Sequence, residues 1–164
     1  MKIFGIDPGS RTTGYGVIDS KGNKSSHIGS GVIQTKEKDF QKRLKVIFTE
    51  IEKLVDEYQP DVVAIENVFM HRNPDSALKL GQARAAAICG TFKQGLTVFE
   101  YAAREVKQAV VGSGAAEKEQ VQYMVKIILD IKNKELKLDE SDALAIAICH
   151  AHSYSMNKKI GNDN

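Results

Sequence analysis

The chain has 164 residues, of which 42% are hydrophobic and 27% charged, and a formal net charge of +2. This length and composition suit one compact α/β domain with its own core, and they exclude disordered and fibrous proteins. Asp7 interrupts the first apolar run too early for a signal peptide, and no apolar stretch approaches the roughly 20 residues of a membrane-spanning helix. Cys89 and Cys149 lie in apolar, helix-like surroundings, where a reduced thiol acts as a small buried hydrophobe. We therefore expect a cytoplasmic protein with one domain over residues 1–156 and a frayed tail over residues 157–164.

The first half of the chain predicts four strands and one helix. Three strands joined as a meander are expected at residues 2–7, 13–19 and 25–35. The first of them carries apolar residues without polar alternation, so it should be covered on both faces and central in its sheet. Apolar residues at spacings of three and four then predict a helix over residues 40–58. A dense apolar run predicts a buried fourth strand over residues 61–66.

The second half is mostly helical. An Asn-Pro-Asp-Ser turn precedes a segment rich in Ala, Leu and Lys, which predicts a long helix over residues 76–94. A fifth strand is expected at residues 97–101. Further helices are expected at residues 102–111, 116–130 and 139–152. This order of elements suits an α/β fold with a mixed five-stranded sheet and helices on both faces.

Four acidic residues fall where these elements would bring them together. Asp7 ends the first strand, and Glu66 ends the fourth. Asp139 and Asp142 are three residues apart at the start of the last helix, so they share one face. Carboxylates so close would raise one another's pKa and destabilise the fold unless a divalent cation offset their repulsion. Oxygen ligands alone favour a hard ion, so Mg2+ or Mn2+ is expected rather than Zn2+.

Each acid taken alone also has a structural explanation. Asp7 precedes Pro-Gly-Ser, and Asp is common in the first position of a β-turn. Asp139 and Asp142 would suit the cap and the positive dipole end of a helix. Glu66 is harder to explain in this way, because a charge beside a run of buried apolar residues needs a partner or a task. The combination of the four favours a catalytic site.

Five segments, in order along nearly the whole chain, resemble the RuvC family of bacterial Holliday-junction resolvases. They are GIDPGSRTTGYGVI, AIENVFM, DSALKLGQAR, VFEYAAREVKQAVVGSGAAEKEQVQ and DESDALAIAICHAH. The resemblance implies a ribonuclease-H-like fold and two Mg2+ ions in each active site, which Mn2+ can replace. It also implies that four residues are both catalytic and metal-binding: Asp7, Glu66, Asp139 and Asp142. Some relatives carry His at the last of these positions, so that ligand is the most replaceable one.

The resemblance further implies how the protein acts on DNA. It would be a homodimer that resolves four-way junctions by paired symmetric nicks in DNA recombination and repair, with the RuvA-RuvB branch-migration complex as a partner. Lys118 is expected to be catalytic by stabilising charge on the scissile phosphate, although a helix lysine alone is usually only a solvated charge. An exposed Phe69 could stack on an unpaired base at the junction centre. The expected DNA contacts are Phe69, Arg72, Lys79, Arg84, Lys107 and Lys118.

Small residues on the helix over residues 76–94 suggest where another helix packs. Gly81, Ala85 and Gly90 permit close approach, whether the second helix belongs to the same chain or to a partner. The resembling family uses this helix in its dimer contact. We therefore expect these three residues at the dimer interface.

Three other functions fit part of the sequence. Asp-Pro-Gly-Ser-Arg-Thr-Thr-Gly resembles the phosphate-binding hairpin of actin-like and sugar-kinase-like ATPases, but those proteins use two duplicated lobes and this sequence has no repeat. A non-catalytic junction-binding protein would be expected to lose some of the four acids. A ribonuclease for hybrid duplexes would have no evident use for Phe69 or for the dimer helix. The sequence favours a junction endonuclease.

Overall fold

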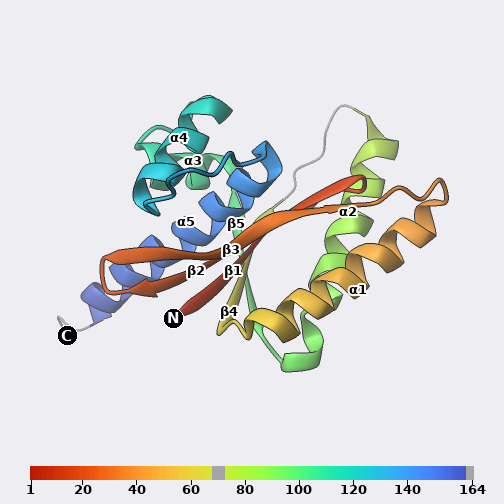
Figure 1. Ribbon diagram of the computed structural model, residues 1–164, viewed down its shortest axis with the longest axis horizontal. Helices are drawn as coiled ribbons and strands as arrows, with labels where there is room; N and C mark the ends of the chain where they lie inside the picture. Colours follow the sequence, from red (N-terminus) through yellow and green to blue (C-terminus); the bar gives the residue numbers. More distant parts are fainter. Residues whose placement is uncertain (68–72, 162–164) are drawn as a thin grey trace.

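Five strands form one sheet in the order β3-β2-β1-β4-β5 (Figure 1). The computed structural model describes residues 1–67 and 73–161. β1 lies at the centre, antiparallel to β2 and parallel to β4, as its uninterrupted apolar sequence predicted. β3 pairs antiparallel with β2, and β5 pairs parallel with β4. The strands are β1 (Lys2–Asp7), β2 (Thr12–Lys21), β3 (Lys24–Gln34), β4 (Val62–Asn67) and β5 (Thr97–Ala102).

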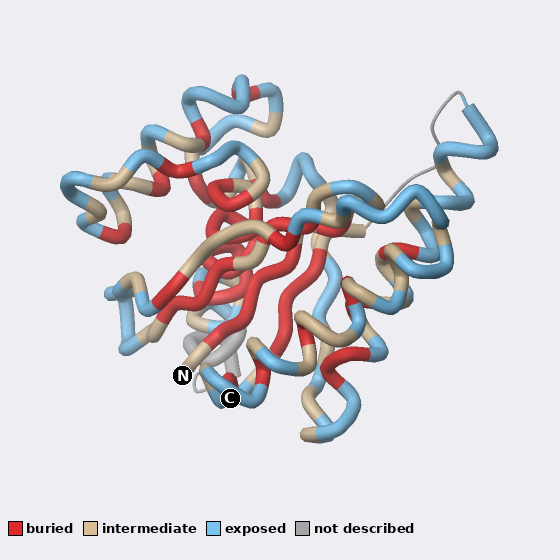
Figure 2. The backbone as a smooth tube through the Cα atoms, turned by 45° about the vertical axis from the view of Figure 1, so that its right-hand side comes forward, coloured by how far each residue is buried: buried red, intermediate tan, exposed pale blue. Residues whose placement is uncertain are grey.

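Helices cover both faces of this sheet, so the predicted mixed α/β architecture is confirmed (Figure 1). On one side lie α1 and α2, and on the other lie α3, α4 and α5. The buried stretches run along the central strands between these two layers (Figure 2). The helices are α1 (Phe40–Tyr58), α2 (Pro74–Cys89), α3 (Ala103–Val111), α4 (Lys118–Ile128) and α5 (Leu138–Gly161), with a short 3-10 helix, η1 (Phe92–Gln94).

Strand alternation divides the core in two. Successive side chains of a strand point to opposite faces of the sheet. Phe4 and Ile6 pack with α1 and α2, whereas Ile3 packs with α3, α4 and α5. Residues at odd positions of β1 therefore face α5.

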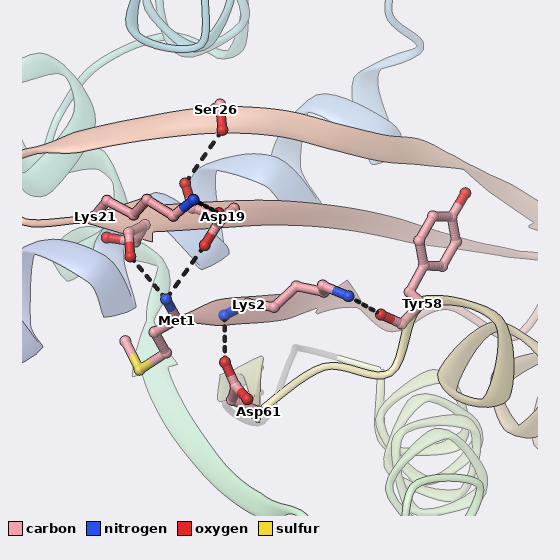
Figure 3. A network of polar contacts seen from close by, with 8 residues as sticks. Met1, Lys2, Asp19, Lys21, Ser26, Tyr58 and Asp61 are labelled. Atoms are coloured by element: carbon pink, nitrogen blue, oxygen red, sulfur yellow. Dashed lines mark hydrogen bonds and ion pairs between the residues drawn. The ribbon is translucent and has the colours of Figure 1, made fainter.

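Polar contacts tie down the start of β1, at the end of the strand opposite Asp7 (Figure 3). The amino group of Met1 donates to the Asp19 carboxylate at 3.2 Å, and the backbone N–H of Lys2 donates to the Asp61 carboxylate at 2.6 Å. The Lys2 ammonium also donates to the carbonyl oxygen of Tyr58. These contacts fix β1 to β2 and to the turn before β4, so the register of the three strands is set far from the acidic residues.

The C-terminal ends of two helices differ by several residues from the sequence-based expectation. The helix expected over residues 76–94 ends at Cys89, and η1 follows as a separate turn. At this end, the backbone N–H and the hydroxyl of the buried Thr91 both donate to the carbonyl oxygen of Ile88, at 2.9 and 2.7 Å. The last helix, expected to end at His152, continues to Gly161.

The two cysteines also differ from each other. Cys149 is buried as expected, but Cys89 is exposed on α2, so the expectation of a buried thiol was wrong for Cys89. Burial raises the pKa of the Cys149 thiol to about 12. Within the described part of the chain, none of the helices has the length and apolar character needed to cross a bilayer.

Candidate active site

Strand alternation places Asp7 and Glu66 on the face covered by α5. Asp7 follows Ile3 at even spacing along β1, and Glu66 follows Ala64 in the same way along β4. Ile3 and Ala64 both belong to the core cluster under α5. β1 and β4 are parallel neighbours in which Ile6 pairs with Ile65, so the next residue of each strand is its acid. Both carboxylates therefore lie at the same end and on the same face of the sheet.

Glycines in the sheet let α5 bring its acids to this end. Gly14 is the cross-strand partner of Asp7, and a Cβ atom there would lie 1.9 Å from the carbonyl oxygen of Asp139. A Cβ atom at Gly5 would lie 2.1 Å from the carbonyl oxygen of Ala143. Only glycine allows a backbone to approach a strand so closely. The first turns of α5 consequently rest directly on β1 and β2, beside Asp7.

Glu140 fixes the start of α5 without joining the site. Its buried carboxylate accepts a hydrogen bond from the backbone N–H of Lys137 at 3.2 Å and pairs with the ammonium of Lys134. Lys134 in turn donates to the hydroxyl of Ser30 on β3 at 3.1 Å. Glu140 thus anchors the start of α5 to the sheet, while Asp139 and Asp142 remain partly exposed.

A cavity of about 220 Å³ opens at this end of the sheet. Three of the four predicted acids line it, and apolar side chains of α3, α4 and α5 form much of its wall. Two of the predicted lysines, one from α3 and one from α4, complete the rim. The charged lining residues are Asp7, Glu66, Asp142, Lys107 and Lys118.

The pKa of Asp7 shows how strongly the acids interact. Burial and the neighbouring charges of Glu66, Asp142 and Asp139 raise the pKa of Asp7 to about 8, while Lys118 acts in the opposite direction. Asp139 therefore acts electrostatically on Asp7 although it does not line the cavity. The structure brings together the four acids that the sequence singled out.

Lys118 provides positive charge within the acidic cluster. Its ammonium donates to the Asp142 carboxylate at 2.9 Å. This hydrogen bond, together with the charges of Asp142, Asp7 and Asp139, raises the pKa of Lys118. The lysine is therefore firmly protonated beside Asp142, at the edge of the cavity.

The donor set fits a hard divalent ion in its chemistry. Every candidate ligand is a carboxylate, the type that Mg2+ and Mn2+ prefer, and repulsion among the acids favours a cation. As the side chains now stand, no three His, Cys, Asp or Glu residues in the described ranges are close enough together to hold one ion. Ion binding therefore requires carboxylate rotation, and Lys118 competes for Asp142.

The other predicted DNA contacts are placed differently from one another. Lys107 lines the cavity, whereas Lys79 is exposed on α2 and pairs with Asp75 at 2.7 Å. Arg84 is largely enclosed and interacts with β4 and β5, so its charge is already used within the subunit. Phe69 and Arg72 lie outside the described residues.

The predicted interface residues do not share one face of α2. Gly81 and Ala85 are exposed on the same side of the helix. Gly90 is buried, and a Cβ atom there would lie 2.8 Å from the carbonyl oxygen of Phe48 on α1. Gly90 therefore packs against α1 within the subunit, rather than at the dimer interface where it was expected. Leu78 is 67% exposed on the same side of α2 as Ala85, and it was not among the interface residues expected from the sequence.

The fold and the acidic cluster define a class of protein. A mixed sheet whose central strands and last helix gather carboxylates at one cavity is a ribonuclease-H-like nuclease architecture. The model of the family "Crossover junction endodeoxyribonuclease RuvC" matches residues 3–150. The chain belongs to this family, whose members are metal-dependent nucleases. Membership does not favour the alternative ATPase function.

Similar proteins agree with this assignment. The crossover junction endodeoxyribonuclease RuvC of Yersinia enterocolitica serotype O:8 / biotype 1B is 53% identical over 161 residues, covering 98% of this chain and 92% of that protein. The structure of Thermus thermophilus RuvC has a TM-score of 0.86 at 34% identity, covering 96% of this chain and 97% of that one. The same T. thermophilus protein in complex with a Holliday junction substrate has a TM-score of 0.88 at 33% identity, covering 96% of each chain.

Proposed function

We propose that this protein is an endonuclease that resolves four-way DNA junctions by paired symmetric nicks, in DNA recombination and repair. The observation that carries the proposal is one cavity lined by the acids Asp7, Glu66 and Asp142 and by the lysines Lys107 and Lys118. Burial and the neighbouring acids raise the pKa of Asp7 there. Such a cluster costs stability and is typical of a catalytic site. Membership of a family of crossover junction endodeoxyribonucleases supplies the substrate class.

The acids are the proposed ligands of two Mg2+ ions, for which Mn2+ can substitute. Such ions, when bound, lower the pKa of a water nucleophile and stabilise charge on the attacking and leaving oxygens of a phosphodiester. Asp7 lies between the acid of β4 and those of α5, which suits it to bridge the ions. Glu66 would hold one side of the site, and Asp139 and Asp142 the other.

The lysines are proposed to handle the phosphate. Lys118 is the catalytic cation, because its protonated ammonium lies among the acids at the cavity and can meet the developing charge on the scissile phosphate. Lys107, from α3, would hold the adjacent phosphate of the DNA backbone. Phe69, Arg72 and Lys79 are proposed as further junction contacts.

A homodimer is proposed to match the symmetry of the junction. A four-way junction has approximate two-fold symmetry, so a two-fold dimer places one active site at each of two strands. The proposed contact is the exposed side of α2, on which Leu78, Gly81, Ala85 and Cys89 follow one another at helical spacing. The RuvA-RuvB branch-migration complex is the proposed partner. The proposed location is the cytoplasm, where a bacterial chromosome offers such junctions.

A synthetic four-way junction with a mobile core tests the function. Each strand is labelled in turn, and nicks are mapped with and without Mg2+. The proposal expects Mg2+-dependent nicks at symmetric positions in two opposing strands, and little cutting of a linear duplex of the same sequence. Equal cutting of the duplex, or binding without any nicking at all metal concentrations, would refute it.

A further inference from the structure

Arg84 joins three elements that meet beside the active site. Its Nε–H donates to the carbonyl oxygen of Glu66 at 3.1 Å, and its Nη2 lies 2.6 Å from the Oε1 atom of Glu100. The residue itself belongs to α2, whereas Glu66 ends β4 and Glu100 belongs to β5. One guanidinium therefore connects α2 with the ends of two neighbouring strands.

The burial of Arg84 indicates that this connection is its main role. The side chain is only 18% exposed, and Nη2 is fully enclosed. Nη2 makes no hydrogen bond of regular geometry, so the carboxylate of Glu100 balances its charge by proximity. A buried guanidinium separated from its partner would be strongly unfavourable. Arg84 is consequently poorly placed to swing out to a DNA phosphate.

The carbonyl oxygen of Glu66, to which Arg84 donates, lies just beyond the point where β4 stops pairing with β1. Pairing between β1 and β4 ends at Ile6 and Ile65, one residue before Glu66. On the other side, β5 still pairs Tyr101 with Glu66. The peptide of Glu66 thus lies beyond the β1–β4 ladder, and the hydrogen bond from Arg84 restrains it. Because the carbonyl carbon and Cβ are both bonded to Cα, fixing the peptide also fixes the direction of the Cα–Cβ bond from which the Glu66 carboxylate extends.

We infer that Arg84, supported by Glu100, is a positioning residue for the Glu66 carboxylate and links α2 to the active site. The inference rests on the proposed function, in which Glu66 is a metal ligand. It deepens that function by assigning to Arg84 a role other than phosphate binding. Ala85, the next residue, lies on the exposed face of α2 proposed to meet the second subunit. A shift of α2 at that contact would therefore also move the peptide of Glu66, because the Arg84 side chain connects the two.

Arg84→Lys separates positioning from phosphate binding. Lysine keeps the positive charge but has no planar fork that can reach both oxygens in the same way. Positioning predicts junction affinity within about twofold of wild type and a single-turnover rate at saturating Mg2+ lower by about tenfold or more, because small displacements of reacting groups are costly. Phosphate binding predicts the opposite split: a normal rate for Arg84→Lys, and weaker, less salt-dependent binding for Arg84→Met.

Two further variants complete the test. Glu100→Gln removes the charge of the partner but keeps a side-chain oxygen that can accept from the guanidinium, and position 100 is 47% exposed, so the fold should survive. It is expected to lower the rate severalfold without weakening junction binding. Lys93→Met is the matched control, because Lys93 also forms an ion pair between elements, with Asp56 at 2.9 Å, but far from the cavity. Its rate and binding should equal those of wild type.

Hydrogen exchange provides a readout that does not depend on cutting. Amides of β4, Val62–Asn67, should exchange faster in Arg84→Lys than in wild type, while those of β3 stay unchanged. If wild type fails to nick junctions, the proposed function fails, and the exchange of β4 still reports whether Arg84 restrains Glu66. If wild type nicks but Arg84→Lys and Glu100→Gln nick as fast, the positioning role is refuted. If Arg84→Lys does not fold, the rate and affinity of Glu100→Gln decide.

Discussion

The ammonium of Lys118 lies 2.9 Å from the carboxylate of Asp142. Helix α4 therefore places a cation where the proposed metal site requires carboxylate oxygens. If Asp142 holds a divalent ion, as proposed, that ion would compete with Lys118 for the same carboxylate. A displaced ammonium could then contact a phosphate. The proposal thus gives Lys118 two roles, balancing the acids before metal binds and contacting the substrate afterwards.

Lys118→Met should show both effects at once. Removing a positive charge from the cluster should lower the Mg2+ concentration needed for half-maximal activity. The maximal rate should fall by about a hundredfold, as for other groups that stabilise transition-state charge. A Mg2+ titration of single-turnover cleavage measures both quantities. Lys126→Met, farther along α4, should change neither. A higher Mg2+ requirement in Lys118→Met would contradict the competition.

Asp7→Asn should abolish cleavage and retain junction binding. The amide has nearly the size of the carboxylate but lacks the charge needed to bridge metal ions, while the phosphate contacts are unaffected. Gel-shift and cleavage assays on one preparation check this. Nicking that stays above roughly a tenth of the wild-type rate would rule out the bridging role.

The stability of the metal-free protein should fall as pH rises from about 4 to about 8. The folded pKa of Asp7 is raised from 3.8 to about 8, so across this window the folded state binds a proton that the unfolded state has lost. Stability from this group is therefore complete below the unfolded pKa and is lost as pH approaches the folded one. Thermal unfolding in EDTA at pH 5 and pH 8 measures the loss. Asp7→Asn, which cannot titrate, should lose less; equal losses in both proteins would refute the assignment.

Mg2+ should restore the stability that is lost at pH 8. An ion bound only by the folded state raises the free energy of unfolding by mass action. The unfolding midpoint of wild type should rise with Mg2+ concentration, and that of Asp7→Asn should rise much less. Mn2+ should also support cutting, whereas Ca2+ should support little, because its looser coordination positions the water poorly. Equal cleavage rates with Ca2+ and Mg2+ would contradict the proposed metal chemistry.

Ala85→Glu should yield a folded monomer that has lost paired incision. A charge on the exposed side of α2 costs little in an isolated subunit but would be buried without a partner in the proposed interface. Sedimentation reports the mass, and circular dichroism reports the fold. Gln41→Glu, at an exposed position of α1, adds the same charge elsewhere, and this variant should remain dimeric. A dimeric Ala85→Glu protein with normal resolution would place the interface on another surface.

Local patterns in the sequence were enough for most of the fold. Helix α1 has the predicted bounds, and β1 is central because its apolar run is long enough to need cover on both faces. The helix expected over residues 76–94 was too long, because apolar periodicity does not reveal that α2 ends at Cys89 and that η1 follows as a separate turn. Gly90 and Ala85 are both small residues of one segment, so the sequence does not distinguish their roles. Only the position of α1 shows that Gly90 packs within the subunit.

The acids of the site were predictable because strand ends and helix spacing carry them. Asp7 and Glu66 each close an apolar run, and Asp139 and Asp142 share a helical face. The contact between Gly14 and the Asp139 carbonyl was not predicted, since it depends on where α5 lies on the sheet. A glycine inside a strand was the available signal. The role of Arg84 depends likewise on the positions of β4 and β5. From the sequence alone, its positive charge indicated a contact to DNA phosphates.

The close approach of Gly14 to Asp139 makes the acidic cluster depend on the docking of α5. The contact joins segments widely separated along the chain, so the entropy of a long loop closure opposes its formation. A nascent chain that has formed β1 and β4 holds Asp7 and Glu66 but lacks the pair on α5. Docking of α5 completes the core under the sheet and the acidic cluster in the same step. A molecule in which α5 has not docked would therefore lack the complete set of proposed catalytic acids, and the capacity to cut DNA would arise only together with the finished fold.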